Sequence, residues 1–178
     1  LTCIKGYTET LLADPQFERE PAATFLQTIL KNTNHMVMIV DDLLKLARLE
    51  ARDQRIESMP VNAADSLEEA WRSCTPMAET RKVSLENRLP RDGVLVQGDM
   101  DRLVQVFRNL IENALKFSPE GESITVSCEV GDKQITFSVQ DNGIGIPTPH
   151  QQRIFERFYR IERYRDRESG STGLGLAI

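Results

Sequence analysis

The sequence has few of the residues from which metal sites and disulfide frameworks are built. Its 178 residues include three cysteines, two histidines and one tryptophan, and aromatic residues make up only 6%. Cys3, Cys74 and Cys128 lie far apart and show no CxxC or Cys/His spacing. This distribution disfavours a zinc site or a disulfide, so we expect buried, reduced thiols in a reducing, cytosolic environment.

Long apolar runs and an excess of basic residues are also absent. No run is long enough to span a bilayer and no signal peptide opens the chain, so we expect this chain to make no membrane contact. A membrane anchor upstream in a longer parent protein stays open. The net charge of -5 argues against nucleic-acid binding, which needs clustered lysine and arginine. The remaining composition, 40% hydrophobic and 28% charged, is that of one or two small globular domains.

Two helices are predicted in the N-terminal region. Residues 1–13 form the end of one helix, a connection runs from Asp14 to about Pro21, and residues 22–51 form a long helix without glycine or proline. Two adjacent apolar stripes follow this long helix: Phe25, Ile29, Asn32, Met36, Ile39, Leu43 and Leu46, then Leu26, Leu30, Val37, Val40, Leu44 and Ala47. So wide an apolar face suits a four-helix bundle, which a two-helix chain can build only as a dimer.

A mixed α/β pattern follows a polar linker at residues 52–60. Helices are predicted at 63–81, from Asp99 to about residue 118, and at 149–159, with strands at 83–89, 94–97, 123–130 and 134–140. The last two strands form a hairpin around Gly131-Asp132. Because the chain begins at Leu1 within a predicted helix and stops at Ile178 where another begins, we expect a piece of a longer protein.

Three polar or glycine-rich segments carry the chemistry. Asn109, Asn113 and Lys116 lie at i, i+4 and i+7 of a predicted helix, hence on one face, and two amide oxygens with a cation suit a magnesium–polyphosphate pair. A solvated polar face explains the same spacing equally well. The segment from Asp141 to Pro147, DNGIGIP, follows a predicted strand. Its aspartate can accept a hydrogen bond from an exocyclic amine such as that of adenine, although, taken alone, the segment is explained better by a glycine-rich turn after a strand.

The third segment, GSTGLGLAI at residues 170–178, places glycines before an apolar run. Such a loop entering a helix N-terminus favours phosphate, yet the spacing matches neither a Walker loop nor a dinucleotide-binding fingerprint.

Taken in order, NLIENALKFS, DNGIGIP, FERFYR and GSTGLGLAI resemble the N, G1, F and G2 boxes of bacterial sensor histidine kinases. LTCIKGYTETLL resembles the sequence just after the phospho-accepting histidine, and IVDDLLKLARLE resembles the end of the second dimerisation helix. Within this family the chain is most similar to the phosphate-regulon type. The resemblance implies an α+β chain: a helical hairpin at 1–51, a linker at 52–60, and at 61–178 an α/β sandwich of the histidine kinase, gyrase and Hsp90 type that lacks its C-terminal part.

The resemblance also assigns roles to individual residues. Asn113 corresponds to the Mg²⁺ ligand, with the catalytic pair Asn109 and Lys116 near metal and phosphates, and Asp141 corresponds to the adenine-binding residue. Further nucleotide contacts are implied for Phe117, Gly143, Gly145, Phe155, Phe158, Gly173, Leu174 and Gly175, and γ-phosphate contacts for Arg157 and Arg160. The cofactors implied are ATP and Mg²⁺. Hydrolytic relatives carry a catalytic glutamate where Asn109 stands, so an asparagine there suits phosphoryl transfer to a histidine better than activation of water.

The phospho-accepting histidine is expected just upstream of Leu1, because His35 and His150 do not occupy its place in the resemblance. The implied partners are a second copy of the chain, through the hairpin, and the receiver domain of a response regulator. The implied location is the cytosolic side of an inner-membrane-anchored bacterial protein. Two alternatives stay open: a catalytically inactive dimerisation scaffold, and a hydrolytic ATPase of the gyrase and Hsp90 class.

Overall fold

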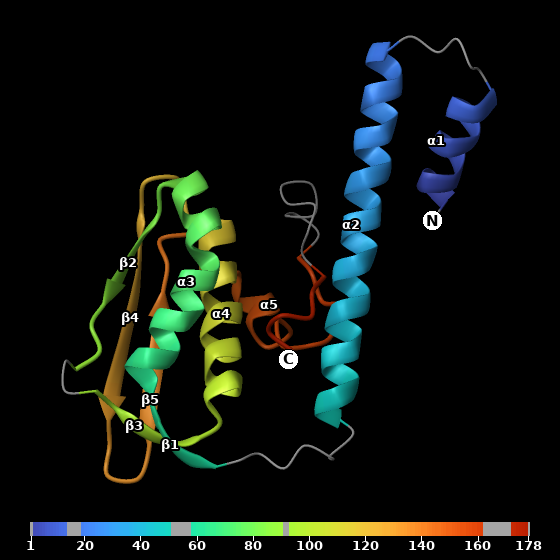
Figure 1. The fold of residues 1–178 in the computed structure, drawn as a ribbon. Coiled ribbons are helices and arrows are strands. Elements are labelled where there is room, and N and C mark those ends of the chain that lie inside the picture. Colours follow the sequence, from blue (N-terminus) through green and yellow to red (C-terminus); the bar gives the residue numbers. More distant parts are fainter. Residues whose placement is uncertain (1, 14–18, 51–57, 91–92, 162–171, 178) are drawn as a thin grey trace. The chain divides into compact units, whose positions relative to one another are not determined.

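The computed structural model describes residues 2–13, 19–50, 58–90, 93–161 and 172–177 (Figure 1). The chain divides into two compact units. One comprises residues 54–153, and the other joins residues 1–53 to residues 154–178. Each unit is described by itself below.

A helical hairpin opens the chain. Helix α1 spans Thr2–Ala13 and α2 spans Arg19–Glu50, and the ring of Tyr7 stacks on that of Phe25 with centroids 4.8 Å apart. The hairpin confirms the two predicted helices. However, α2 begins at Arg19 rather than at residue 22, because Pro21 falls in the first helical turn, where its missing N–H costs no hydrogen bond.

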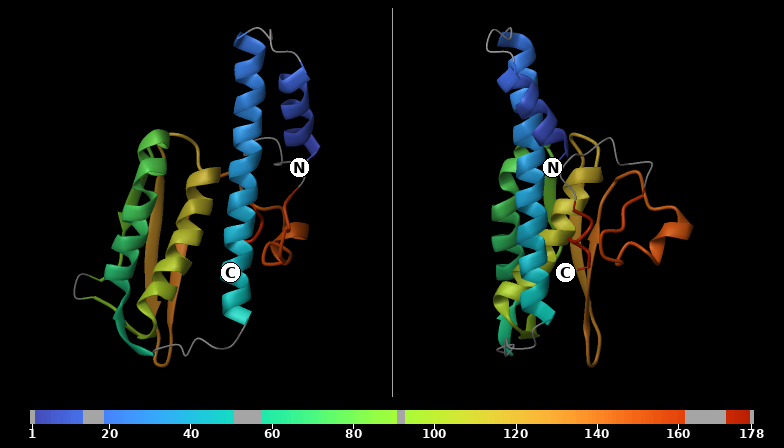
Figure 2. Two further views of the ribbon diagram at one scale, coloured as in Figure 1. Left: turned by 45° about the vertical axis from the view of Figure 1, so that its right-hand side comes forward. Right: turned by 90° about the vertical axis from the view of Figure 1, so that its right-hand side faces the viewer.

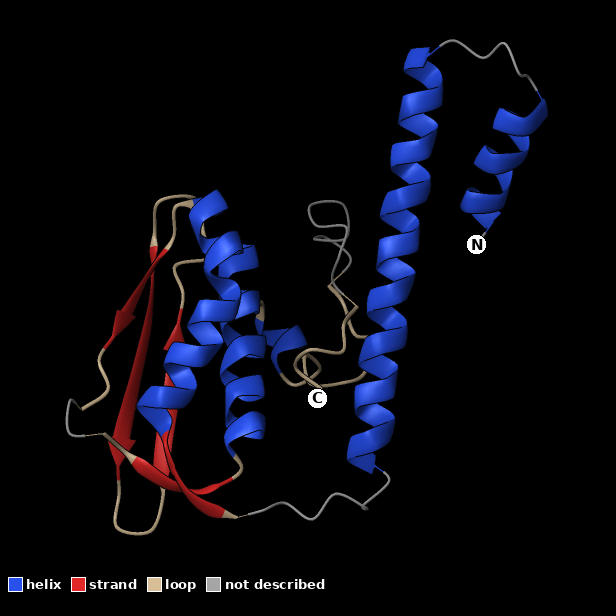
Figure 3. Cartoon of the chain, in the orientation of Figure 1, coloured by secondary structure: helices blue, strands red, loops and turns tan. Residues whose placement is uncertain are grey.

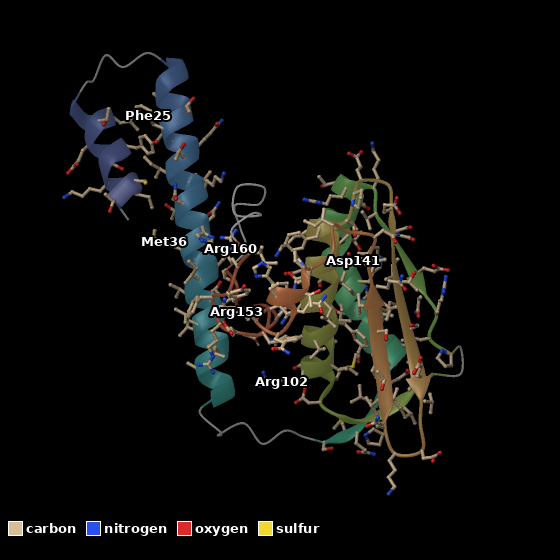
Figure 4. The ribbon with its side chains drawn as sticks, turned by 180° about the vertical axis from the view of Figure 1, so that it is seen from behind. Phe25, Met36, Arg102, Asp141, Arg153 and Arg160 are labelled. Atoms are coloured by element: carbon tan, nitrogen blue, oxygen red, sulfur yellow. The ribbon has the colours of Figure 1, made fainter. Side chains whose placement is uncertain are left out.

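The two apolar stripes of α2 have different environments. The first contains half-buried residues, among them Phe25 and Met36, which are labelled in Figure 4. The second is exposed: the accessible fractions are 56% for Leu26, 60% for Leu30, 54% for Val37, 53% for Val40 and 52% for Leu44. Within the hairpin as described, α2 therefore keeps an uncovered apolar face along much of its length.

The second unit is an α/β domain (Figure 3). Its elements are β1 (Met59–Asn62), α3 (Ala63–Arg81), β2 (Ser84–Asn87), β3 (Leu95–Gly98), α4 (Met100–Phe117), β4 (Ser123–Val130), β5 (Ile135–Gln140) and α5 (Thr148–Gln151). Strands β1 and β3 form an antiparallel pair, and a three-stranded sheet has the order β2-β4-β5, with β2 parallel and β5 antiparallel to β4. The predicted hairpin is confirmed. Strand β1 is not predicted from the sequence, because its first residues, Met59 and Pro60, belong to the polar segment interpreted as a linker.

Helices α3 and α4 cover one face of the three-stranded sheet (Figure 2). Strand β4 alternates as half-buried sheets do, with Ile124 and Val126 fully buried toward the helices. Phe107 of α4 meets Phe137 of β5 edge to face, with ring centroids 5.5 Å apart. Each fully buried large apolar side chain contributes about 1.5–3 kcal/mol, so this core fixes α4 firmly on the sheet.

Side chains define where α3 and α4 begin and end. The Asp99 carboxylate accepts the N–H of Arg102 at 3.1 Å, and the Asn62 side chain accepts the N–H of Ala64 at 3.0 Å, so both helices have capped N-termini. Helix α3 ends at Lys82, which has a left-handed backbone (φ 53°). The predicted starts and ends of both helices are thereby confirmed.

Three predictions are corrected by the structure. The helix predicted at 149–159 is limited to α5, which ends at Gln151, and the φ of +61° at Phe158 excludes that residue from an α-helix. The helix start predicted near the chain's end is only a turn, in which the Ala177 N–H donates to the Leu174 carbonyl at 2.9 Å. Cys3 is exposed, whereas Cys74 is buried, and burial raises the pKa of its thiol. The segment 162–171 lies outside the described residues.

Candidate functional site

The polar face of α4 lies opposite its buried face. Successive residues of an α-helix turn by about 100°, so the side chains of Asn109, Asn113 and Lys116 lie within an arc of about 60°. All three are half-buried. Phe107, Ile111, Ala114 and Leu115 of the same helix are buried in the core. The core thus holds the helix in the one rotation that leaves both amides and the ammonium at its outer face.

The C-terminal end of α4 is fixed from α3. The Arg81 guanidinium donates from Nη1 to the Lys116 carbonyl at 2.9 Å, and the Ser118 N–H donates to the Ala114 carbonyl at 2.9 Å. The second bond is the last i→i−4 bond of the helix, and the first satisfies a carbonyl that the helix end leaves without an intrahelical partner. Sequence reasoning missed Arg81, because a bond between residues 35 apart leaves no local signal.

The loop after β5 forms a tight turn around Asp141, which is labelled in Figure 4. The Gly143 N–H donates to Asp141 Oδ1 at 2.8 Å, and the Asn142 amide donates to Glu122 Oε2 at 2.9 Å. Asp141 itself is exposed. The turn thereby fixes the position of Asp141 Oδ1, while the side chain stays accessible to a ligand at the surface.

Glycine is required at position 143 by close packing. A Cβ built there would lie 2.6 Å from Asp141 Oδ1 and 2.9 Å from the carbonyl oxygen of Phe117, closer than real Cβ contacts. The Asp141 turn is therefore seated directly on the end of α4, next to Lys116. Two motifs that lie far apart in the sequence meet at this point. Gly145 has open space around it but a φ of +70°, which also favours glycine.

Exposed apolar side chains accompany this turn. Phe117 is 38% exposed, Ile144 51% and Ile146 42%. Apolar surface beside a single oriented carboxylate suits a flat heterocycle that presents an amino group. Sequence reasoning missed Ile144 and Ile146, although their alternation with glycines in an exposed loop was a usable signal.

The remaining predicted residues lie in the unit that joins residues 1–53 to residues 154–178. Phe155 is 62% and Phe158 54% exposed, and Arg160, labelled in Figure 4, is half-buried. The Phe158 N–H donates to the Gly173 carbonyl at 2.9 Å, and a Cβ on Gly173 would lie 2.9 Å from the Phe158 carbonyl carbon. The F-box and G2-box segments are thus joined backbone to backbone. Leu174 is fully buried and Gly175 half-buried.

The described residues contain no group of three or more histidine, cysteine, aspartate or glutamate side chains that could hold a metal ion. The donors on α4 are amide oxygens, from Asn109 and Asn113. Such a set fits Mg²⁺ shared with substrate phosphates, because that ion takes few protein ligands and keeps several from phosphate and water.

The packing at position 143 predicts the effect of adding one methyl group. Gly143→Ala should lower the free energy of unfolding of this unit by about 1–3 kcal/mol, because the turn must move away from Phe117. Urea unfolding followed by the fluorescence of Trp71 measures it. Gly98→Ala is the control, since a Cβ there meets nothing within 4 Å. Equal stability of the two variants would show that the turn is not seated as described.

Two family models match the chain. "His Kinase A (phospho-acceptor) domain" matches residues 1–52, and "Histidine kinase-, DNA gyrase B-, and HSP90-like ATPase" matches residues 98–178. A match to a phospho-acceptor domain gives no support to the expectation that the chain lacks the phosphorylated histidine.

Curated relatives align with the whole chain. The sensor histidine kinase WalK of Bacillus subtilis is 34% identical over 187 residues, covering 100% of this chain and 29% of the relative. The phosphate regulon sensor protein PhoR of Pseudomonas aeruginosa is 35% identical over 181 residues, covering 100% of this chain and 40% of the relative. The chain therefore spans well under half the length of these relatives.

Solved structures share the fold. The histidine kinase AdeS of Acinetobacter baumannii superposes with a TM-score of 0.73 at 23% identity, covering 99% of this chain and 79% of that one. The histidine kinase ThkA in complex with the response regulator protein TrrA superposes with a TM-score of 0.73 at 19% identity, covering 89% of this chain and 46% of that one. None of the described helices is both long and apolar enough to cross a membrane. With both family regions matched in order and relatives aligned along its full length, the chain belongs to the sensor histidine kinases.

Proposed function

We propose that the chain is the part of a protein-histidine kinase that binds ATP with Mg²⁺ and directs the γ-phosphoryl group to a histidine, for relay to an aspartate of a response regulator. The observation that carries the proposal is the seating of Gly143 on the Phe117 carbonyl. It joins the Asp141 turn to the helix end that bears Lys116. In the proposed site, Asp141 is the acceptor for an amine and Lys116 is the cation for phosphate.

Each side chain has a defined task in this proposal. Asp141 accepts a hydrogen bond from the adenine amino group, while Phe117 packs against the nucleoside. Asn113 is a ligand of Mg²⁺, and Asn109 and Lys116 contact the phosphates. The metal supplies charge neutralisation when bound. The protein's own contribution is to position the triphosphate and stabilise its negative charge, which is the main source of catalysis in phosphoryl transfer.

The remaining nucleotide contacts are assigned from the resemblance alone. We assign Gly173, Leu174 and Gly175 to the phosphates, Phe155 and Phe158 to the anchoring of the loop that covers the nucleotide, and Arg160, with Arg157, to the γ-phosphate. The backbone bond between Phe158 and Gly173 supports a common movement of these two segments. The proposed domains are a phospho-acceptor hairpin at 1–51, a connection at 52–60 and a catalytic domain from 61 onward.

We propose the acceptor histidine at the place that the resemblance gives it, before Leu1, and propose neither His35 nor His150 for the role. His35 lies on α2 half-buried, and its Nδ1 is buried without a hydrogen-bond partner among the described residues. The regulator is proposed to dock on the hairpin. The use of ATP and the free thiols support a cytosolic location.

Nucleotide binding is tested by removing the charge that faces adenine. Asp141→Asn should weaken binding of a non-hydrolysable ATP analogue with Mg²⁺ at least about tenfold, because a hydrogen bond to a charged group contributes about 1.5–3 kcal/mol. Calorimetric titration measures this, and Asp132→Asn in the exposed hairpin loop is the matched control. Equal loss in both variants, or no binding by a folded wild-type chain, would favour the scaffold alternative.

Phosphoryl transfer is tested in the full-length protein. Asn113→Ala should reduce autophosphorylation at least about tenfold, the effect of weakening a metal's ligand shell. His35→Ala should leave the phosphorylation level unchanged. Loss of phosphate in the His35 variant would place the acceptor on α2. Steady ATP hydrolysis without any phosphoprotein would instead favour the hydrolytic ATPase.

Dimerisation is tested on the exposed stripe of α2. Leu30→Glu and Leu44→Glu should each weaken self-association at least about tenfold, because burying an uncompensated charge costs several kcal/mol. Sedimentation velocity over a concentration series measures the change. Lys31→Glu is the control, since residue 31 points away from the stripe. A wild-type chain that stays monomeric at every concentration would contradict the dimer.

A further inference from the structure

One hydrogen bond links α2 to the glycine loop near the end of the chain. The Thr172 hydroxyl donates to Asp42 Oδ2 at 2.6 Å, although the two residues are 130 positions apart. Both belong to the same compact unit. A distance of 2.6 Å is typical of the short, strong hydrogen bonds that hydroxyl groups form with carboxylates. Asp42 therefore holds the residue that directly precedes Gly173.

The face of α2 that bears Asp42 also contains a buried residue. Leu46 is 8% exposed and is the buried residue of α2 among those described, whereas Leu43 is 41% and Leu44 52% exposed. Leu46 lies one turn after Asp42 and hence on the same face of the helix. Asp42 and Thr172 are themselves half-buried, so the contact is partly shielded from water.

The bond to Asp42 is continued within the loop. Thr172 Oγ1, which donates to Asp42, also accepts the N–H of Leu174 at 3.2 Å. The Gly173 carbonyl accepts the Phe158 N–H, and the Leu174 carbonyl accepts the Ala177 N–H, both at 2.9 Å. Leu174 is fully buried. The loop is therefore fixed in one conformation, with its hydroxyl donor directed at a carboxylate and the Leu174 amide directed at that hydroxyl.

We infer that the Asp42–Thr172 contact is autoinhibitory: it holds the glycine loop in a form that must open before the loop can bind the phosphates of ATP. The inference rests on the proposed function. Phosphate oxygens and a carboxylate oxygen are anionic acceptors that compete for the same donors. In this structure the Thr172 hydroxyl donates to Asp42 and the Leu174 N–H donates to that hydroxyl, so neither donor is available to a phosphate oxygen.

Competition of this kind makes the nucleotide and α2 mutually exclusive ligands of one loop. By linkage, any signal that moves α2 away from Thr172 raises the affinity for ATP, and bound ATP favours the released helix by the same factor. The helix is thereby a regulator of the nucleotide site through a single side chain, in addition to its part in the hairpin.

The test compares nucleotide binding by the wild-type chain, Asp42→Ala and the control Asp41→Ala, which removes the exposed carboxylate next to it. Calorimetric titration uses a non-hydrolysable ATP analogue with Mg²⁺. Asp42→Ala should bind about fivefold tighter or more, the lower end of typical coupling between linked sites, and Asp41→Ala should bind as the wild type does. Binding by Asp42→Ala that is equal to or weaker than that of the wild type overturns the inference and leaves the nucleotide site intact.

Amide hydrogen exchange without nucleotide tests the contact independently. The Leu174 amide should exchange faster in Asp42→Ala than in the wild type, because Thr172 is released. Unchanged exchange overturns the contact. Asp42→Asn keeps the shape of the side chain and one acceptor oxygen, so its Leu174 amide should exchange at a rate between those of the wild type and Asp42→Ala. This variant replaces Asp42→Ala in the test if the alanine variant does not fold. If the wild type and both Asp42 variants are folded and none binds the analogue, the proposed function fails and the autoinhibitory role fails with it.

Discussion

The packing of α4 against α3 and the three-stranded sheet is the constraint on which the site depends. Phe107, Ile111 and Leu115 are buried to 1% exposure or less, and burial of these side chains fixes both the position and the rotation of the helix. The polar residues Asn109, Asn113 and Lys116 then have only one direction in which to point. No interaction among the polar side chains themselves is needed to create this face. A hydrophobic core on one side of a helix organises the chemistry on the other.

A second constraint is steric and acts through the backbone. Gly143 has no side chain, and this allows the Asp141 turn to rest on the last residues of α4, while Arg81 holds the same helix end from α3. The position of the carboxylate relative to Lys116 therefore follows from backbone contacts, which vary less than contacts between flexible side chains. The same logic operates in the other unit, where Gly173 and the left-handed Phe158 bring two segments together. Gly143 and Gly173 are thus close-packing positions, whereas an added Cβ at Gly145 or Gly175 would meet nothing within 4 Å.

Much of the secondary structure could be predicted because its signals are local. The cap residues Asn62 and Asp99 mark helix starts, and the alternation in β4 and β5 marks a hairpin. The helix predicted at 63–81 is confirmed although it contains Pro76, because its buried residues keep it on the core. The failures have tertiary causes. Strand β1 was missed because so short a strand depends on its pairing with β3. Of the helix predicted at 149–159 only α5 forms, and Phe158 instead has a positive φ and bonds to Gly173, a contact that no local pattern predicts.

The sequence by itself determined the family, the order of the motifs and the residue types of the site, since these depend on spacing along one chain. It also determined that Asn109, Asn113 and Lys116 share a face, because helical periodicity is local. Only the tertiary structure decided that the Asp141 turn lies against the Phe117 carbonyl, that Arg81 holds the end of α4, and that Asp42 bonds to Thr172. These contacts join residues up to 130 positions apart. Their physical reason is that the core and the backbone geometry set the distances between segments, and no local pattern encodes such distances.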